Sequence, residues 1–252
     1  MILLICKFIF LFFFFFTLLW VLLDTIYQYI LIPHYRIKRK RKRDHGFLYH
    51  VYFTLPYLLA QNIEDRFSNE FKEHGFILFS GKQGSGKTMA MTYYIKQLQN
   101  KYDRVKVYTN YGYLNQSDFL VDYHQLIDLN NGLDGICFGF DEIQATFSSR
   151  NWKENFDPSL LACICQNRKS HRLIFGTCQN IQLVDKSIRI QCMKFAKCFT
   201  FFGFLTLVVF FEPEYDFEGN LSKSKFRGLK FFFQTKELRS YYDTFLLIQS
   251  IK

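Results

Sequence analysis

The chain has 252 residues, of which 49% are hydrophobic and 20% aromatic, and a composition this apolar excludes an intrinsically disordered protein. Its net charge is +10. Arg36 and the run Lys38–Arg43 supply seven of the positive charges. The rest of the chain is therefore not a strongly basic nucleic-acid binder by composition, and a basic pore formed on assembly stays an alternative. Seven scattered cysteines, with no zinc-site spacing, are expected to be reduced core residues.

The first segment predicts a membrane anchor over residues 1–32. Between Ile2 and Leu23 every residue except Lys7 is apolar or weakly polar, and a helix of this length measures roughly 33 Å, the thickness of a hydrocarbon core. The basic cluster follows the apolar run, unlike the charges of a cleaved signal peptide. By the positive-inside rule the N-terminus lies outside and the rest of the chain in the host cytoplasm.

Residues 33–45 form a basic juxtamembrane linker, which we expect to contact anionic lipid. A nuclear-localisation signal is the alternative interpretation of KRKRKR, but it fits poorly beside a spanning helix. Residues 46–252 then form a cytoplasmic domain, beginning with a segment that is partly helical around residues 56–66. Its core is expected at about 75–190 and a strand-rich extension at about 191–252.

The core begins with a phosphate-binding loop. Gly75–Ser80 is a short apolar strand, GKQGSGKT follows at residues 81–88, and Thr88–Lys101 has helical spacing of apolar residues. Strand, loop and helix in this order form a P-loop, whose backbone N–H groups and helix N-terminus bind phosphate. The residues expected to bind ATP are Gly81, Lys82, Gln83, Gly84, Ser85, Gly86, Lys87 and Thr88.

Within this loop two side chains have a specific expected role. Lys87 is expected to bridge the β- and γ-phosphates, and the Thr88 hydroxyl to bind Mg²⁺. The second half of such a site is an apolar strand with an acidic end, which occurs at Gly135–Glu142 (GICFGFDE). Asp141 is expected to hold Mg²⁺ and Glu142 to act as the general base that activates water. We expect these residues to meet Lys87 across adjacent strand ends.

A strand at residues 172–177 leads into a third group of polar residues. Gln179 is the candidate for a residue that contacts the γ-phosphate or the attacking water, and Thr177 is the second candidate; both are also compatible with an ordinary loop. Ring ATPases complete each site with an arginine from the neighbouring subunit. The residues that could do so here are Arg150, Arg168, Arg172 and Arg189.

The remaining pattern predicts the fold. Strands near residues 75–80, 104–109, 135–140 and 172–177 alternate with helices near 87–100 and 158–169, which indicates an α/β P-loop NTPase with a mostly parallel sheet covered by helices. The apolar run Cys198–Phe211 is short for a second span and favours two buried strands bent near Gly203. With strands over residues 226–234 and 241–248, it predicts an antiparallel extension of the sheet.

Three stretches resemble the zonular occludens toxin-like family, which includes the gene-I-type assembly proteins of filamentous phages and belongs to the FtsK–HerA class of P-loop ATPases. They are GKQGSGKT, DEIQATFSSRNW at residues 141–152, and QNRKSHRLIFGTCQNIQLVDKSIR at residues 166–189. The similarity covers roughly residues 75–189. YYDTF at residues 241–245 is also similar to the family.

The resemblance implies an inner-membrane ATPase that drives single-stranded phage DNA through an assembly site while coat subunits are added. It places Lys87, Thr88, Asp141 and Glu142 in the roles given above and puts Gln179 at the sensor position. The implied cofactors are ATP and Mg²⁺. The implied partners are single-stranded DNA, membrane lipid, phage coat or assembly proteins, and further copies of the chain in a homo-oligomeric ring.

The sequence departs from the family in the features that follow, and three other functions stay open. The spanning helix comes first here, and Cys178 separates Thr177 from Gln179. A DNA-transfer motor of a plasmid or conjugative element would use the same chemistry. A scaffold that binds ATP with little hydrolysis is a second alternative. A small-molecule kinase fits least, because no acceptor-binding lid is recognisable.

Overall fold

The computed structural model of the chain describes residues 2–31, 46–66, 70–147, 158–216 and 219–242. The chain divides into two compact units, residues 1–69 and residues 70–252. The first contains the helices α1 (Ile2–Leu31), α2 (Phe47–Tyr49) and α3 (Leu55–Arg66), with a π-helical turn, His50–Thr54, between α2 and α3. Of these, α3 confirms the helix expected around residues 56–66.

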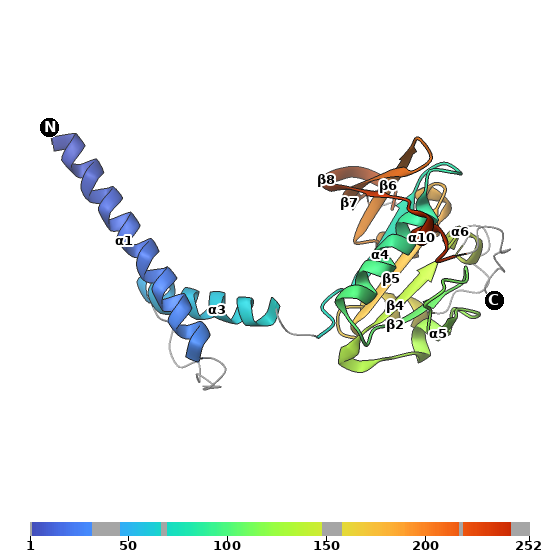
Figure 1. Cartoon of the computed structure of the whole chain (residues 1–252), viewed down its shortest axis with the longest axis horizontal. Helices are drawn as coiled ribbons and strands as arrows, with labels where there is room; N and C mark the ends of the chain where they lie inside the picture. The colour runs from blue at the N-terminus through green and yellow to red at the C-terminus, as the bar shows by residue number, and fades with distance from the viewer. Residues whose placement is uncertain (1, 32–45, 67–69, 148–157, 217–218, 243–252) are drawn as a thin grey trace. The chain divides into compact units, whose positions relative to one another are not determined.

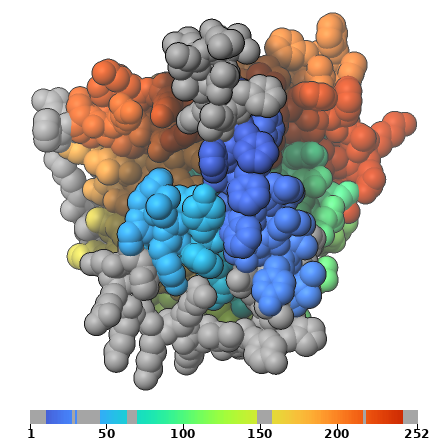
Figure 2. All heavy atoms as spheres, turned by 90° about the vertical axis from the view of Figure 1, so that its left-hand side faces the viewer, coloured from blue at the N-terminus to red at the C-terminus, as the bar shows by residue number. Residues whose placement is uncertain are grey.

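Within this first unit α1 packs against α3, and the two helices lie side by side in Figure 2. α1 exposes large apolar side chains. The five phenylalanines Phe12–Phe16 are each more than half exposed. No helix within the part of the chain that the structure describes is both long enough and apolar enough to span a membrane. This finding gives no support to the anchor expected over residues 1–32, and the linker expected over 33–45 lies outside the described residues.

The second unit is built on a sheet that comprises eight strands within the described residues (Figure 1). In spatial order these are β3 (Asp118–Phe119), β2 (Lys106–Thr109), β4 (Ile136–Phe140), β5 (Arg172–Cys178), β1 (Gly75–Ser80), β6 (Lys194–Phe201), β7 (Leu205–Tyr215) and β8 (Leu221–Phe233). The strands from β3 to β6 are parallel, and β7 and β8 are antiparallel. The expected α/β fold with a mostly parallel sheet is therefore confirmed.

Helices cover both faces of this sheet, as the strand sequences require. Along β1, Phe76 and Leu78 belong to one buried cluster and Phe79 to the other, because successive side chains of a strand point to opposite faces. The long helix α4 (Lys87–Lys101) packs on the Phe79 face (Figure 1). Three shorter helices pack on the other face: α6 (Ile143–Thr146), α8 (Pro158–Cys165) and α9 (Lys186–Ile190).

The helix expected over residues 158–169 is shorter than predicted. α8 ends at Cys165, and residues 166–170 form turns that lead into β5. His171, the residue before β5, has a left-handed backbone (φ 46°), a conformation that no helix continues through. Apart from these main elements, the described part of the second unit contains short helical turns at Gln125–Asp128 (α5), Gly132–Asp134 (η2), Ile181–Leu183 (η3) and Lys236–Arg239 (α10).

The antiparallel extension was predicted correctly in its main features. The run Cys198–Phe211 forms a hairpin of β6 and β7 that turns at Gly203, but it is only partly buried: Phe199 and Phe201 are 46% and 48% exposed. One face of the hairpin packs against α4, whereas the other presents these aromatic side chains. β8 confirms the strand expected over residues 226–234. Where a further strand was expected, Tyr242 makes one isolated bridge with Tyr113, and residues 243–252 lie outside the described ranges.

Candidate active site

The P-loop connects the end of β1 with the start of α4. Gly84 and Gly86 have left-handed backbone angles, with φ of 76° and 85°, which glycine adopts without the steric penalty of a side chain. Gly86 is the N-cap residue of α4, and its carbonyl accepts a hydrogen bond from the amide of Ala90 at 2.8 Å. The N–H groups of the first turn of α4 are thus directed at the space in front of the loop, where an anion is favoured.

Lys87 is buried, with only 7% of its surface exposed. Its ammonium group folds back over the loop and donates a hydrogen bond to the carbonyl of Lys82 at 3.3 Å. The next residue, Thr88, donates from its hydroxyl to the carboxylate of Asp141 at 2.9 Å. The two sequence motifs that were predicted to form one site therefore meet in space.

Asp141 follows β4 directly and is 8% exposed. Its Oδ1 atom also accepts a hydrogen bond from the Thr177 hydroxyl at 2.5 Å. Burial raises the pKa of the Asp141 carboxyl above its usual value, although the hydrogen bonds from Thr177 and Thr88 and the charge of Lys87 act in the opposite direction. The carboxyl is thus a buried acid surrounded mainly by neutral donors.

The main chain of Asp141 is fixed by Asn110, a residue that was not predicted for the site. The Asn110 side-chain oxygen accepts a hydrogen bond from the main-chain amide of Asp141 at 2.7 Å. The Asn110 side-chain NH₂ group donates one to the main-chain carbonyl of Asp141 at 3.0 Å. Asn110 follows β2, the strand beside β4. A polar residue at the carboxyl end of a predicted parallel strand was the available signal, since such ends gather at one edge of a sheet.

Glu142 adopts a left-handed backbone conformation, with φ of 52°, which costs a non-glycine residue about 1 kcal/mol. Its amide donates to the Thr177 hydroxyl at 2.9 Å, so Thr177 holds both acidic residues. The Glu142 carboxylate accepts a hydrogen bond from the side-chain amide of Gln144. The strained turn thus places two consecutive carboxylates with different surroundings, one buried and one half-buried.

The prediction that Lys87 and Asp141 lie on adjacent strand ends is wrong in one respect. β5 lies between β1 and β4, and Gly176 of β5 pairs with both Leu78 and Phe140. Thr177 stands at this intervening position and bridges the acidic residues from there. Thr88, in the first turn of α4, nevertheless reaches Asp141, although β5 lies between β1 and β4.

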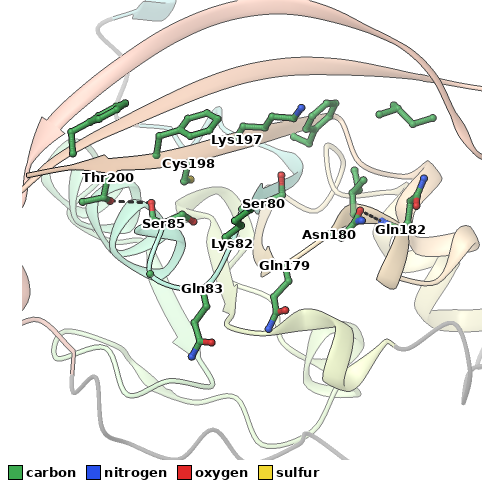
Figure 3. Close-up of a pocket in the computed structure, with 17 residues that line it drawn as sticks. Ser80, Lys82, Gln83, Ser85, Gln179, Asn180, Gln182, Lys197, Cys198 and Thr200 are labelled. Atoms are coloured by element: carbon green, nitrogen blue, oxygen red, sulfur yellow. Dashed lines mark hydrogen bonds between the residues drawn. The ribbon is translucent and has the colours of Figure 1, made fainter. Parts of the chain in front are cut away.

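Gln179 lines a cavity of about 800 Å³ together with the P-loop. The other wall of the cavity is formed by β6, and in Figure 3 the side chains of Gln83 and Gln179 both point away from that strand. Gln179 is exposed, whereas Thr177 is fully buried. The two candidates from β5 therefore differ: Thr177 fixes the acidic pair, and Gln179 is free to contact a bound ligand.

Of the four candidate trans arginines, two are engaged inside the fold. Arg172 is 3% exposed, donates to the carbonyl of Leu129 at 3.2 Å and contacts the thiol of Cys163. Arg189 is 7% exposed and donates to the carbonyl of Gly219 at 2.8 Å. Arg168 is exposed but lies before β5, at the sheet edge opposite the P-loop, and Arg150 lies outside the described residues.

The oxygen atoms of Thr88 and Asp141 fit a magnesium ion. The Thr88 hydroxyl and the Asp141 carboxylate offer oxygen atoms, which Mg²⁺ prefers, and these two atoms are within hydrogen-bond distance of each other. A divalent cation would also offset the burial of the Asp141 charge.

The chain matches no protein-family model, and a comparison with curated proteins finds no match. Among solved structures, the N-terminal domain of zonular occludens toxin from Neisseria meningitidis is 18% identical, with a TM-score of 0.47, over 67% of this chain and 98% of that domain. The DNA-packaging ATPase B204 of Sulfolobus turreted icosahedral virus is 11% identical, with a TM-score of 0.42, over 61% of this chain and 97% of B204.

These structural neighbours are thus a zonular occludens toxin domain and a viral genome-packaging NTPase, and the first belongs to the family that the sequence motifs resemble. At these identities and TM-scores the likenesses carry no argument about activity. The α/β fold of this chain follows from its own strand order and P-loop.

Proposed function

We propose that the chain is a membrane-anchored, Mg²⁺-dependent ATPase that drives DNA movement during assembly and extrusion of a filamentous phage. One observation carries the catalytic part: the Thr88 hydroxyl and the Asp141 carboxylate meet at 2.9 Å beside a buried Lys87. Separate sequence motifs that come together in this way supply a phosphate-binding amine and two oxygen ligands in one place.

Each residue of the site has a distinct proposed role. Lys87 and the N–H groups of residues 81–88 bind the triphosphate. Thr88 and Asp141 hold Mg²⁺, which neutralises charge on the phosphate oxygens. Glu142, whose carboxylate is half-buried, accepts a proton from the attacking water, and Gln179 contacts that water or the phosphate.

The cellular setting is proposed from sequence. The apolar run Ile2–Leu23 and the basic residues 36–43 support a single-pass anchor with the N-terminus outside and the ATPase unit in the host cytoplasm. Single-stranded DNA, coat or assembly proteins and further copies of the chain in a homo-oligomeric ring are the proposed partners. The resemblance to the phage assembly family supports these partners.

The test is ATP turnover by the full chain in detergent, with and without single-stranded DNA. We expect DNA to stimulate phosphate release, and Glu142→Gln to abolish release while MgATP binding is kept. Glu73→Gln, which removes an exposed carboxylate paired with Lys101, is the matched control and should leave turnover unchanged.

The outcomes separate the alternatives. Turnover that survives Glu142→Gln would contradict the assigned base. Nucleotide-dependent oligomerisation of the wild-type chain without phosphate release would instead support the ATP-binding scaffold.

A further inference from the structure

The P-loop is tied to the antiparallel extension by a chain of polar side chains. The Thr200 hydroxyl of β6 donates to the main-chain carbonyl of Ser85 at 3.0 Å, as Figure 3 shows. The hydroxyls of Thr200 and Thr206, which pair across β6 and β7, lie 3.1 Å apart. The side-chain amide of Gln234, just after β8, donates to Thr206 at 2.7 Å.

The hydrogen bonds in this chain run in a single direction. The Gln234 oxygen accepts from the Arg239 guanidinium at 3.1 Å, so its NH₂ group faces the two threonines. Because a carbonyl can only accept, the Thr200 hydrogen goes to Ser85, and Thr200 must accept from Thr206. Donation therefore passes from Gln234 to the P-loop by way of Thr206 and Thr200, and the Gln234 amide also donates directly to Thr200 at 3.4 Å. Hydrogen bonds in such a sequence polarise one another.

Burial and steric contact make this connection specific. Thr206 is fully buried, so its hydroxyl needs partners. A Cβ atom on Gly86 would lie 2.5 Å from the Thr200 hydroxyl oxygen, so the P-loop backbone approaches β6 as closely as glycine allows. The shape of the loop thus depends on β6 as well as on its own glycines.

We propose that Thr200 and Gln234 are positioning residues that hold the P-loop in its phosphate-binding shape through the carbonyl of Ser85. Ser85 directly precedes Gly86 and Lys87, so a shift of its peptide group would move the N–H groups and the amine assigned to phosphate. The expected effect on MgATP binding rests on the proposed ATPase function, whereas the expected effect on the shape of the loop does not. The antiparallel extension is accordingly part of the nucleotide site, because it holds the shape of the loop that binds the phosphates.

The test compares three variants of the full chain in detergent. Thr200→Val removes the hydroxyl at nearly constant volume, Thr200→Ser keeps it, and Thr92→Val is the control. Thr92 is a fully buried threonine of α4 whose hydroxyl contacts Tyr111. Hydrogen exchange of peptides within residues 81–91 is measured without nucleotide. We expect exchange about fivefold faster in Thr200→Val, and wild-type exchange in the other two.

A second measurement separates positioning from general stability. For Thr200→Val we expect the Kd for MgATP to rise about five- to tenfold, with kcat within about twofold of wild type and with Thr200→Ser restoring binding. If Thr200→Val does not fold, Gln234→Leu leaves both threonines in place and permits the same comparison.

Wild-type exchange in Thr200→Val, or equal acceleration in Thr92→Val, would overturn the proposal. Because the exchange measurement needs no nucleotide, it decides the positioning role even if the wild-type chain binds no MgATP. Absence of MgATP binding by the wild-type chain would contradict only the proposed ATPase function.

Discussion

The buried carboxylate of Asp141 is held by hydroxyl groups of Thr88 and Thr177 rather than by a hydrogen-bonded cation. A folded-state pKa above the unfolded value means that the folded chain binds this proton more tightly. The stability that follows is present at low pH and is lost as the pH rises through the folded pKa. At neutral pH the ionised Asp141 therefore destabilises the fold, and Mg²⁺ would relieve this.

Asp141→Asn should consequently stabilise the protein while it abolishes Mg²⁺-dependent turnover. The amide carries no charge, and its oxygen still accepts from the two threonines, so we expect Tm to rise by a few degrees at pH 7–8 and by less near pH 4. Thermal unfolding without nucleotide at the two pH values measures this. Asp103→Asn, on an exposed turn, is the control and should leave Tm unchanged. A lower Tm for Asp141→Asn at neutral pH would contradict the expectation.

For single residues, the sequence was informative where one residue type is required at one spacing. Lys87, Thr88 and Asp141 were predictable because the P-loop motif and the acidic strand end each demand them. Asn110 offered only its place at the end of a predicted strand, and Thr200 offered no signal, since each acts through a main-chain carbonyl or amide that only the folded chain brings near. Burial of Arg172 and Arg189 was equally hidden, because arginine is usually exposed.

The P-loop as an element depends on two glycines that differ in their surroundings. Both Gly84 and Gly86 have positive φ angles, but a Cβ atom on Gly84 meets nothing within 4 Å, whereas one on Gly86 collides with Thr200. Gly84→Ala then carries only the conformational penalty of a left-handed alanine. Gly86→Ala carries the same penalty and a clash with β6.

We therefore expect Gly84→Ala to lower the free energy of unfolding by roughly 1 kcal/mol and Gly86→Ala by roughly 2–4 kcal/mol. Urea unfolding of the two variants beside the wild type measures the difference. The pair is self-controlled, because both changes add one methyl group to the same loop. Equal losses would show that β6 does not press on the loop.

Elements with regular apolar spacing were predicted well, and their ends less so. β1, β4, β5 and α4 are close to the expected ranges because each forms an apolar strand or a helical face, whereas β2 starts two residues later than expected, at Lys106 instead of 104. The two-residue strand β3 gives no periodic signal. The exposed aromatic residues of the β6–β7 hairpin were expected to be buried, since a sequence does not reveal which face of an extension lacks a helix.

The whole molecule consists of two units of different character. Residues 70–252 contain the entire candidate site, and residues 1–69 contain the apolar helix α1. The strand order, with β5 between the two halves of the site, could not be predicted, because order depends on tertiary packing of helices against the sheet. A cell-based experiment tests the proposed membrane anchor.

In a bacterial host we expect the full chain to stay with the membrane fraction after extraction at alkaline pH, and residues 70–252 alone to be soluble. The matched control is the full chain with Phe14→Lys and Leu18→Lys, because each lysine within the bilayer opposes membrane insertion of the helix by about 3 kcal/mol. This variant should be extracted. Extraction of the wild-type chain under the same conditions would exclude a spanning anchor.

The intervening position of β5 has a mechanical consequence. β1 and β4 are each joined to β5 by a continuous row of main-chain hydrogen bonds, so their ends stay about 10 Å apart, the width of two strand spacings. A bound nucleotide cannot draw β1 and β4 together without breaking the hydrogen bonds that join both strands to β5. In the proposed ATPase, structural changes on nucleotide binding are therefore expected in the connecting loops, while β1, β5 and β4 act as a fixed frame.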